Sequence, residues 1–184
     1  MLDKGAWQEL ITGLPFAVSF LAALFTIPAA RWLSFRSGRV KQPRPDRWHT
    51  RPTPALGGVG IFLAFILSLG GFYLAGWAAP VHWSLLAAAG LAFMLGLYDD
   101  IRPLSPPVKL LGQLVAATVV IFFGNYSIHF FPWPIANILL TFFWLVGITN
   151  ALNLLDNMDG LAGGVAFITA VFMSYFSWKI QLRA

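Results

Sequence analysis

The stretch ALGGVGIFLAFILSLGGFYLAGWAAPVHWSLLAAAGLAFMLGLYDD, which runs from Ala55 to Asp100, carries no formal charge until its last two residues. A second uncharged run, Leu110–Leu155, follows after a short polar break. Because a helix needs roughly 20 apolar residues to cross a bilayer, each run is long enough for two spans. The two runs therefore indicate membrane-spanning helices with carboxylates near their ends.

The composition of the whole chain points to the same class. Hydrophobic residues make up 58% of the sequence and charged residues only 10%, whereas a soluble globular domain carries about 25% charged residues. The sequence contains no cysteine, which excludes a disulfide framework and cysteine-based metal or nucleophile chemistry. We expect an integral membrane protein.

Prolines, glycines and charged residues divide the chain into six apolar segments. They are Ile11–Leu33, Ala55–Gly76, Trp83–Tyr98, Val108–Gly124, Ile135–Leu152 and Leu161–Trp178. We therefore predict an all-α, polytopic membrane protein of about six transmembrane helices, with residues 1–184 forming a single transmembrane domain. The first segment is interpreted as a retained span, since the residues before it do not form the basic leader of a signal peptide.

Most of the basic residues lie in one part of the chain. They are Arg31, Arg36, Arg39, Lys41, Arg44, Arg47 and Arg51. The positive-inside rule places this break, Arg36–Pro54, in the cytoplasm. Every second break then faces the same side, so Asp99–Pro107 and Asn153–Gly160 are also predicted to be cytoplasmic. We expect a multi-pass protein of the cytoplasmic (inner) membrane with both termini outside.

The first acidic cluster is the pair Asp99 and Asp100. Carboxylates that border hydrocarbon are costly to place and mark a functional site. Two of them at the C-terminal end of a helix repel each other and the helix dipole, so a cation is expected beside them. Arg102 and Lys109 are candidates from the chain, and a divalent ion is the functional alternative. The simpler alternative is a solvated loop neutralised by Arg102.

The second cluster repeats a polar side chain at every third position, through Asn150, Asn153, Asp156 and Asp159. On an α-helix the first three share a face, while Asp159 has turned halfway round and is expected at a helix end or in a loop. Amide and carboxylate oxygens suit magnesium or manganese rather than zinc. The alternative is an ordinary helix C-cap with incidental polar residues.

A third feature combines His49 and nearby arginines with Gly57 and Gly58, which open the next apolar run. Basic side chains and the amides of a helix N-terminus can bind phosphates. The alternative is a basic cytoplasmic loop with glycines for helix packing.

Together the three features resemble the polyprenyl-phosphate N-acetylhexosamine-1-phosphate transferases. The matching motifs are His49-x-x-Pro52-Thr53-Pro54-x-x-Gly57-Gly58, Asp99-Asp100 followed by Leu104-Ser105-Pro106-x-x-Lys109-Leu110-Leu111-x-Gln113, and Asn150-x-x-Asn153-x-x-Asp156-x-x-Asp159-Gly160-Leu161. The resemblance runs from about Pro43 to Gly164 and departs from many relatives at Asn157, where they have glycine. The loop of His49 and Pro52 is more similar to the branch that uses UDP-N-acetylglucosamine than to the phospho-MurNAc-pentapeptide translocases.

The resemblance implies a magnesium-dependent enzyme that transfers N-acetylhexosamine-1-phosphate, here GlcNAc-1-phosphate, from a UDP-sugar to a polyprenyl phosphate such as undecaprenyl phosphate and releases UMP. This would be the first membrane step of a cell-surface glycan, such as the cell wall, lipopolysaccharide or teichoic acid. Manganese is the alternative ion. The expected partners are the UDP-N-acetylhexosamine, the lipid phosphate and the bilayer, with no nucleic acid; a homodimer is left open.

The resemblance also implies roles for individual residues. Asp99 or Asp100 binds or deprotonates the lipid phosphate and acts in catalysis with Asp156. Asn153 and Asp156 lie near the metal and the diphosphate. The residues expected to bind substrate are His49, Lys109, Asn150 and Asp159. Direct attack by the lipid phosphate and an aspartyl-phosphate intermediate both remain open.

The resemblance further implies a fold of ten or eleven spans, with an Asp-x-Gly-Ser motif and a histidine-rich loop in the later half. Neither motif occurs in these 184 residues, so we expect the chain to correspond to the N-terminal half and Met1–Ala184 alone to insert in a membrane without activity. Three alternatives remain. The first is an ion-coupled transporter, which would hold its acidic residues near the bilayer midplane. The second is a CDP-alcohol phosphotransferase, a family that shares Asp156-x-x-Asp159-Gly160 but does not fit Gly163-Gly164. The third is a non-catalytic membrane scaffold, which would lack activity.

Overall fold

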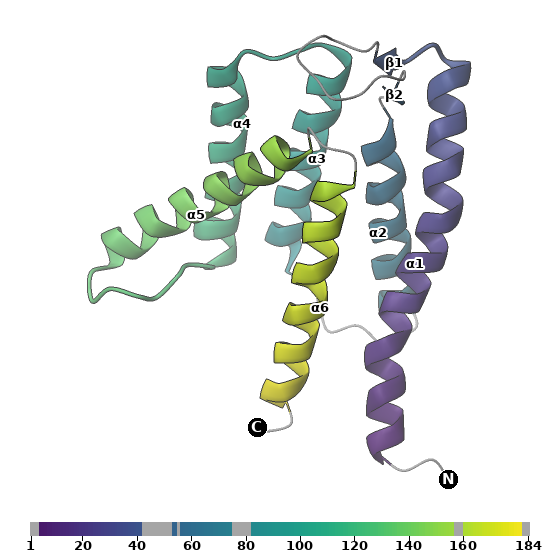
Figure 1. The fold of residues 1–184 in the computed structure, drawn as a ribbon. Coiled ribbons are helices and arrows are strands. Elements are labelled where there is room, and N and C mark those ends of the chain that lie inside the picture. The colour runs from purple at the N-terminus through teal and green to yellow at the C-terminus, as the bar shows by residue number, and fades with distance from the viewer. Residues whose placement is uncertain (1–3, 42–52, 55, 75–81, 157–159, 182–184) are drawn as a thin grey trace.

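The computed structural model describes residues 4–41, 53–54, 56–74, 82–156 and 160–181. Six long helices account for most of these residues (Figure 1). They are α1 (Lys4–Arg36), α2 (Gly57–Leu74), α3 (Trp83–Ile101), α4 (Pro106–Thr118), which continues into the π-helical segment η1 (Val119–Phe123), α5 (Pro134–Leu155) and α6 (Leu161–Gln181). The predicted all-α fold with about six helices is confirmed.

Five helical segments of the described chain are long and apolar enough to cross a membrane. They are Ala17–Arg36, Gly57–Leu74, Trp83–Ile101, Pro106–Phe123 and Pro134–Leu155, while α6 contributes a shorter apolar stretch, Leu161–Ser177. Large apolar side chains face outward, among them Leu74 at 87% exposed and Phe143 at 75% exposed. Such a surface is unfavourable in water but matches lipid. The chain is a polytopic helical membrane protein.

The described helix contacts are built largely on small residues. Most of the buried apolar residues are alanines, namely Ala30, Ala64, Ala88, Ala116 and Ala117. Small side chains let helix backbones approach closely, which is how helices associate where lipid is as apolar as the protein. One close approach between helix backbones joins α1 to α2. A Cβ atom on Gly60 would lie 2.8 Å from the Ile27 Cα, and the Thr26 hydroxyl donates to the Gly60 carbonyl at 2.8 Å.

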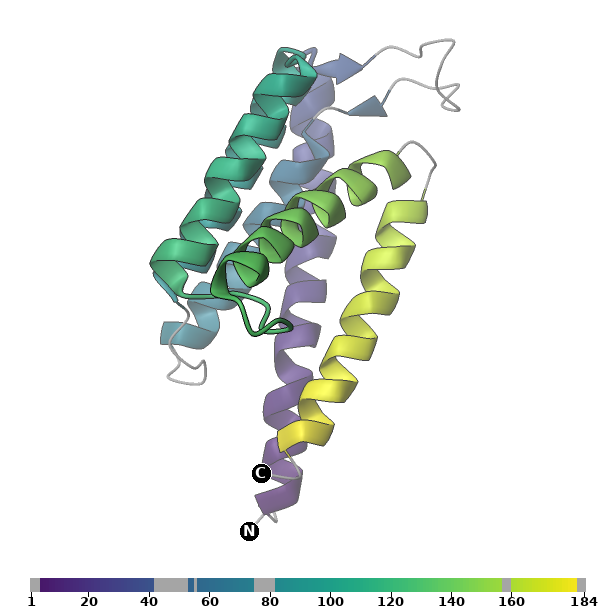
Figure 2. The same ribbon diagram turned by 90° about the vertical axis from the view of Figure 1, so that its left-hand side faces the viewer.

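A short strand pair, which the sequence did not predict, follows α1 and precedes α2. Strand β1 (Val40–Lys41) pairs antiparallel with β2 (Thr53–Pro54), with Val40 opposite Pro54. Figures 1 and 2 place this pair and the α3–α4 connection at one end of the bundle, and the start of α1 and the end of α6 at the other. The C-terminal end of α5 points toward the first of these ends.

One predicted boundary is wrong in a way that matters for function. We expected the third apolar segment to end at Tyr98, with both carboxylates at the C-terminal end of its helix. Helix α3 instead continues to Ile101, because the Arg102 N–H donates to the Tyr98 carbonyl at 2.7 Å. Asp99 and Asp100 therefore lie in the last helical turn, where the backbone fixes their direction.

Helix α5 runs obliquely to the other helices in both views (Figures 1 and 2). Its first turns are tied to the preceding loop by two buried polar residues. The Asn137 side chain accepts from the N–H groups of Phe130 and Phe131, at 3.1 and 2.8 Å, and donates to the Phe131 carbonyl at 2.9 Å. The Thr141 hydroxyl accepts from the Ile128 N–H at 2.9 Å. These bonds fix where α5 starts.

This attachment predicts a loss of stability when Thr141 is replaced by valine. Thr141→Val keeps the shape but leaves the Ile128 N–H without its acceptor, at a cost of about 1–3 kcal/mol and a fall in melting temperature of at least roughly 2 °C. Thr169→Val is the matched control, since the exposed Thr169 hydroxyl bonds only to its own helix through Val165. Thermal unfolding in detergent measures both variants. Equal melting temperatures would show that the loop does not depend on Thr141.

Candidate functional site

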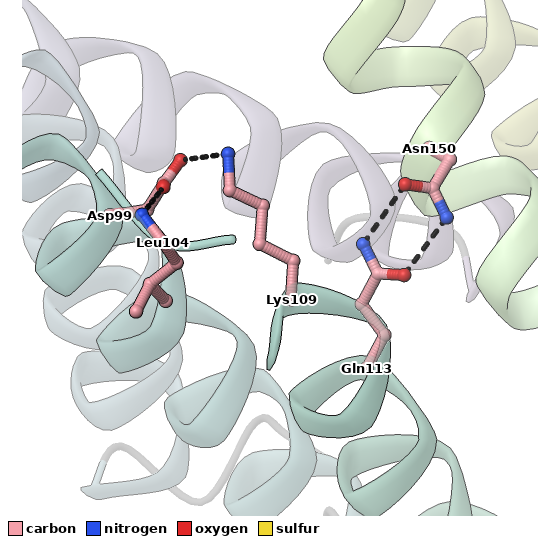
Figure 3. Close-up of polar contacts among 5 residues, drawn as sticks. All are labelled: Asp99, Leu104, Lys109, Gln113 and Asn150. Carbon is pink, nitrogen blue, oxygen red and sulfur yellow. Dashed lines mark hydrogen bonds and ion pairs between the residues drawn. The ribbon is translucent and has the colours of Figure 1, made fainter. Parts of the chain in front are cut away.

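The Asp99 carboxylate is held at both of its oxygens (Figure 3). Its Oδ1 accepts from the Leu104 N–H at 2.9 Å, and its Oδ2 lies 2.8 Å from the Lys109 Nζ. The first contact fixes the chain that leaves α3, and the second reaches the first turn of α4. Asp99 thereby sets the turn between the two helices.

The ion pair is only partly buried. The exposed fractions are 32% for the Lys109 side chain and 26% for Asp99. Ion pairs with this much access to solvent contribute little to stability, because water and salt screen them. The main consequence is positional: a carboxylate and an ammonium group are held side by side where a ligand can reach both.

A second polar contact joins α4 to α5. The Gln113 amide donates to the Asn150 Oδ1 at 3.2 Å, and the Asn150 amide donates in return to the Gln113 Oε1 at 2.8 Å (Figure 3). The same Asn150 amide also donates to the Val146 carbonyl at 2.9 Å. The paired carboxamides hold the later turns of the oblique helix α5 against α4.

These contacts border an open cavity of about 360 Å³ that is lined by α3, α4, η1 and α5. Its polar wall lies toward the α3–α4 connection and is formed by Asp99, Lys109, Gln113, Thr149 and Asn153. The rest of the wall is apolar and lies deeper in the helices; it is formed by Leu85, Ala88, Ala89, Ala92, Leu95, Gly96, Ala116, Ala117, Val120 and Leu145. Polar groups at one end and small apolar groups below fit an amphiphilic ligand with an anionic head, which an ammonium group attracts.

Three of the predicted site residues share this cavity. Asp99, Lys109 and Asn153 line its wall, and Asn150 lies beside it in the pair with Gln113. Asp99 and Lys109 belong to the motif that begins at Asp99, and Asn153 belongs to the motif that begins at Asn150. The structure thus brings the two polar motifs of the sequence to one place.

Two other predicted residues lie close in the chain but outside this wall. Asp100 is half-buried in the same turn as Asp99. Asp156 is exposed and directly follows α5, where its N–H donates to the Leu152 carbonyl at 3.1 Å. The predicted residues His49 and Asp159 lie outside the described residues.

The side-chain oxygen atoms at the end of α5 are of the type that a hard cation such as magnesium prefers. Among the residues that the structure describes, no three His, Cys, Asp or Glu side chains are grouped closely enough to hold a metal ion. Asn153 and Asp156 nevertheless offer the amide and carboxylate oxygens that magnesium prefers, and that ion commonly keeps water and binds phosphate oxygens besides one or two carboxylates. By the type of their oxygen atoms, these two side chains are compatible with magnesium.

Two wall residues, Gln113 and Thr149, were not predicted as site residues. Their positions in the sequence could have indicated that they belong to the site, because Gln113 follows Lys109 by four residues and Thr149 precedes Asn153 by four. Residues four apart share a helix face. The Thr149 hydroxyl donates to the Leu145 carbonyl at 2.7 Å, which leaves its oxygen free to accept.

Comparison with known proteins adds a family assignment. A family model described as glycosyl transferase family 4 matches residues 82–183. The decaprenyl-phosphate N-acetylglucosaminephosphotransferase of Mycolicibacterium smegmatis is 33% identical over 87% of this chain and 44% of its own length. The probable undecaprenyl-phosphate N-acetylglucosaminyl 1-phosphate transferase of Bacillus subtilis is 32% identical over 91% of this chain and 48% of its own.

The chain spans about half the length of these curated relatives. No solved structure matches it.

Proposed function

The chain belongs to glycosyl transferase family 4, and from this premise we propose that the protein carrying it transfers N-acetylglucosamine-1-phosphate from a UDP-sugar to a polyprenyl phosphate and releases UMP. The observation that carries the proposal is the cavity on which Asp99, Lys109 and Asn153 meet above an apolar wall. An anionic head group and an apolar chain are the two parts of a polyprenyl phosphate. The names of the two relatives, a decaprenyl-phosphate and an undecaprenyl-phosphate N-acetylglucosamine phosphotransferase, support the choice of sugar and lipid.

In this reaction an oxygen of the lipid phosphate attacks the β-phosphorus of the UDP-sugar. The bond from that phosphorus to the oxygen bridging the two phosphates breaks, and UMP leaves with the electron pair. Phosphoryl transfer depends mainly on alignment and on neutralising charge. Lys109 binds the lipid phosphate, and Asp99, already held by Leu104, orients the ammonium group. Asp99 or Asp100 accepts the proton of the lipid phosphate.

Magnesium is the proposed cofactor, and Asn153 and Asp156 would hold it. When bound, it would neutralise the diphosphate and the charge that develops on the departing UMP. Manganese has the same preference for oxygen ligands and is the expected substitute. Magnesium-dependent UMP release from UDP-N-acetylglucosamine and undecaprenyl phosphate tests the reaction. Release from the sugar donor without the lipid phosphate would contradict it.

The activity prediction uses three carboxylates in the full-length gene product that carries this sequence. Asp99→Asn, Asp100→Asn and Asp156→Asn each keep the side-chain size and remove the charge. Loss of one group that stabilises charge in a transition state commonly lowers the rate by about 10²–10³, so we expect losses of this order in UMP release at unchanged expression. Glu9→Gln, outside both motifs, is the matched control. Near-normal turnover in all three variants would exclude the proposed catalytic role.

We propose that the polar motifs face the cytoplasm, where the basic segment after α1 is expected under the positive-inside rule. These 184 residues contain no cysteine, so single cysteines can be introduced as labels once any cysteine elsewhere in the full-length protein is replaced by serine. Ser105 belongs to the α3–α4 connection and Ser127 to the η1–α5 connection, and these two connections lie at opposite ends of the bundle. Ser105→Cys should react with a membrane-impermeant maleimide only in inverted vesicles, and Ser127→Cys only in intact cells. The reverse pattern would place the site outside.

A further inference from the structure

A basic and aromatic surface lies at the end of α1 that is nearest β1, and we call it the α1 basic surface. It consists of Arg31, Trp32, Phe35 and Arg36, all of which are exposed. Ala30 and Ser34 face the opposite way, since both are buried and an α-helix turns once in 3.6 residues. The α1 basic surface therefore points away from the rest of the bundle.

Two cation–π contacts bring its guanidinium groups together. The Arg31 Cζ lies 5.8 Å from the centre of the Phe35 ring, one turn further along the helix. The Arg36 Cζ lies 4.9 Å from the centre of the Trp32 ring, one turn back. Each arginine thus reaches toward the other, and both guanidinium groups lie over the same turn. A stacked guanidinium keeps its N–H edge available for an oxyanion.

The backbone under this surface is fixed. Helix α1 ends in a Schellman arrangement, in which the Gly38 N–H donates to the Phe35 carbonyl at 3.3 Å and the Arg39 N–H donates to the Ser34 carbonyl at 2.9 Å. Gly38 takes the left-handed conformation that this motif needs, with φ of 69°. The fully buried Ser34 hydroxyl also donates to the Arg39 carbonyl. The arginines are thereby presented from a rigid helix end.

An apolar strip continues the α1 basic surface toward the middle of the membrane. Leu21, Leu24 and Phe25 lie on the same side of α1 and are 54%, 53% and 75% exposed. Phe25 precedes Arg31 by six residues, a rise of about 9 Å along the helix. Charged groups at one level and exposed apolar groups about two to three turns below match the head group and acyl chains of a phospholipid.

We propose that the α1 basic surface binds the phosphate head group of an anionic phospholipid, with the acyl chains lying along the apolar strip. Charge complementarity favours this occupant, because among the residues that the structure describes no carboxylate forms an ion pair with Arg31, Arg36 or Arg39. The apolar strip below favours a lipid over a soluble phosphate. The surface is independent of the proposed enzyme site, since α2 lies between α1 and α3 (Figure 1).

The test compares lipid binding by variants of the full-length protein in native mass spectrometry. Phosphatidylglycerol and phosphatidylcholine of identical chains are added singly to detergent-purified protein, and the preference for the anionic lipid is the ratio of their dissociation constants. Arg31→Gln with Arg36→Gln should lower this preference by about tenfold or more, given about 1 kcal/mol per arginine near a lipid surface. Unchanged preference in the double variant would overturn the proposal.

Two further variants separate this site from general attraction of basic residues to lipid. Lys179→Gln is the matched control, because Lys179 stacks on Tyr175 at 5.8 Å in the same kind of contact but on α6; its preference should equal that of the wild type. Arg31→Lys with Arg36→Lys keeps both charges but loses the planar guanidinium groups, and should lose most of the preference. If the lysine pair keeps all of it, or if Lys179→Gln loses as much as the glutamine pair, the α1 basic surface is not a specific site.

Discussion

The constraint on which the described site depends is the cost of placing a carboxylate beside hydrocarbon. For Asp99 this cost is offset by the hydrogen bond from the Leu104 N–H and by the ion pair with the Lys109 ammonium group. These contacts set the turn from α3 into α4, and α4 in turn carries Gln113 to its partner on α5. Because Asp99 lies in the last turn of its helix, its position differs from the midplane acids of an ion-coupled carrier.

The sequence predicted the helices well because apolar length is nearly sufficient to define a span in a bilayer. It placed the end of α3 three residues too early, at Tyr98, although Asp99 and Asp100 were expected at the C-terminal end of a helix. Their repulsion is offset by Lys109, which lies ten residues further on and could be assigned only as a candidate. The β1–β2 pair left no comparable pattern in the sequence, because each strand is only two residues long. The oblique course of α5 left none either, because it depends on hydrogen bonds from loop backbone groups to Asn137 and Thr141.

The site was predictable in its charged members and less so in its neutral ones. Asp99 and Lys109 stand out because charge is rare in this chain, and Asn153 stands out through its regular spacing. Gln113 and Thr149 are ordinary polar residues in apolar helices. Only the packing of α5 against α4 shows that the helix face with Gln113 and the helix face with Thr149 line the same cavity. A helix face can be read from sequence, but the neighbour it faces depends on packing between distant segments.

The close contact between Gly60 and Ile27 bears on the order of folding. Helices α1 and α2 are neighbours in the sequence and approach each other through backbone atoms, so their association needs no later segment. Helices form locally, and chains emerge from the ribosome N-terminal end first. The α1–α2 hairpin can therefore pack as soon as its second helix has entered the bilayer, and the cavity can form only after α5 has been synthesised. Substitutions at Gly60 would act on an early assembly step, and substitutions at Gln113 or Asn150 on a late one.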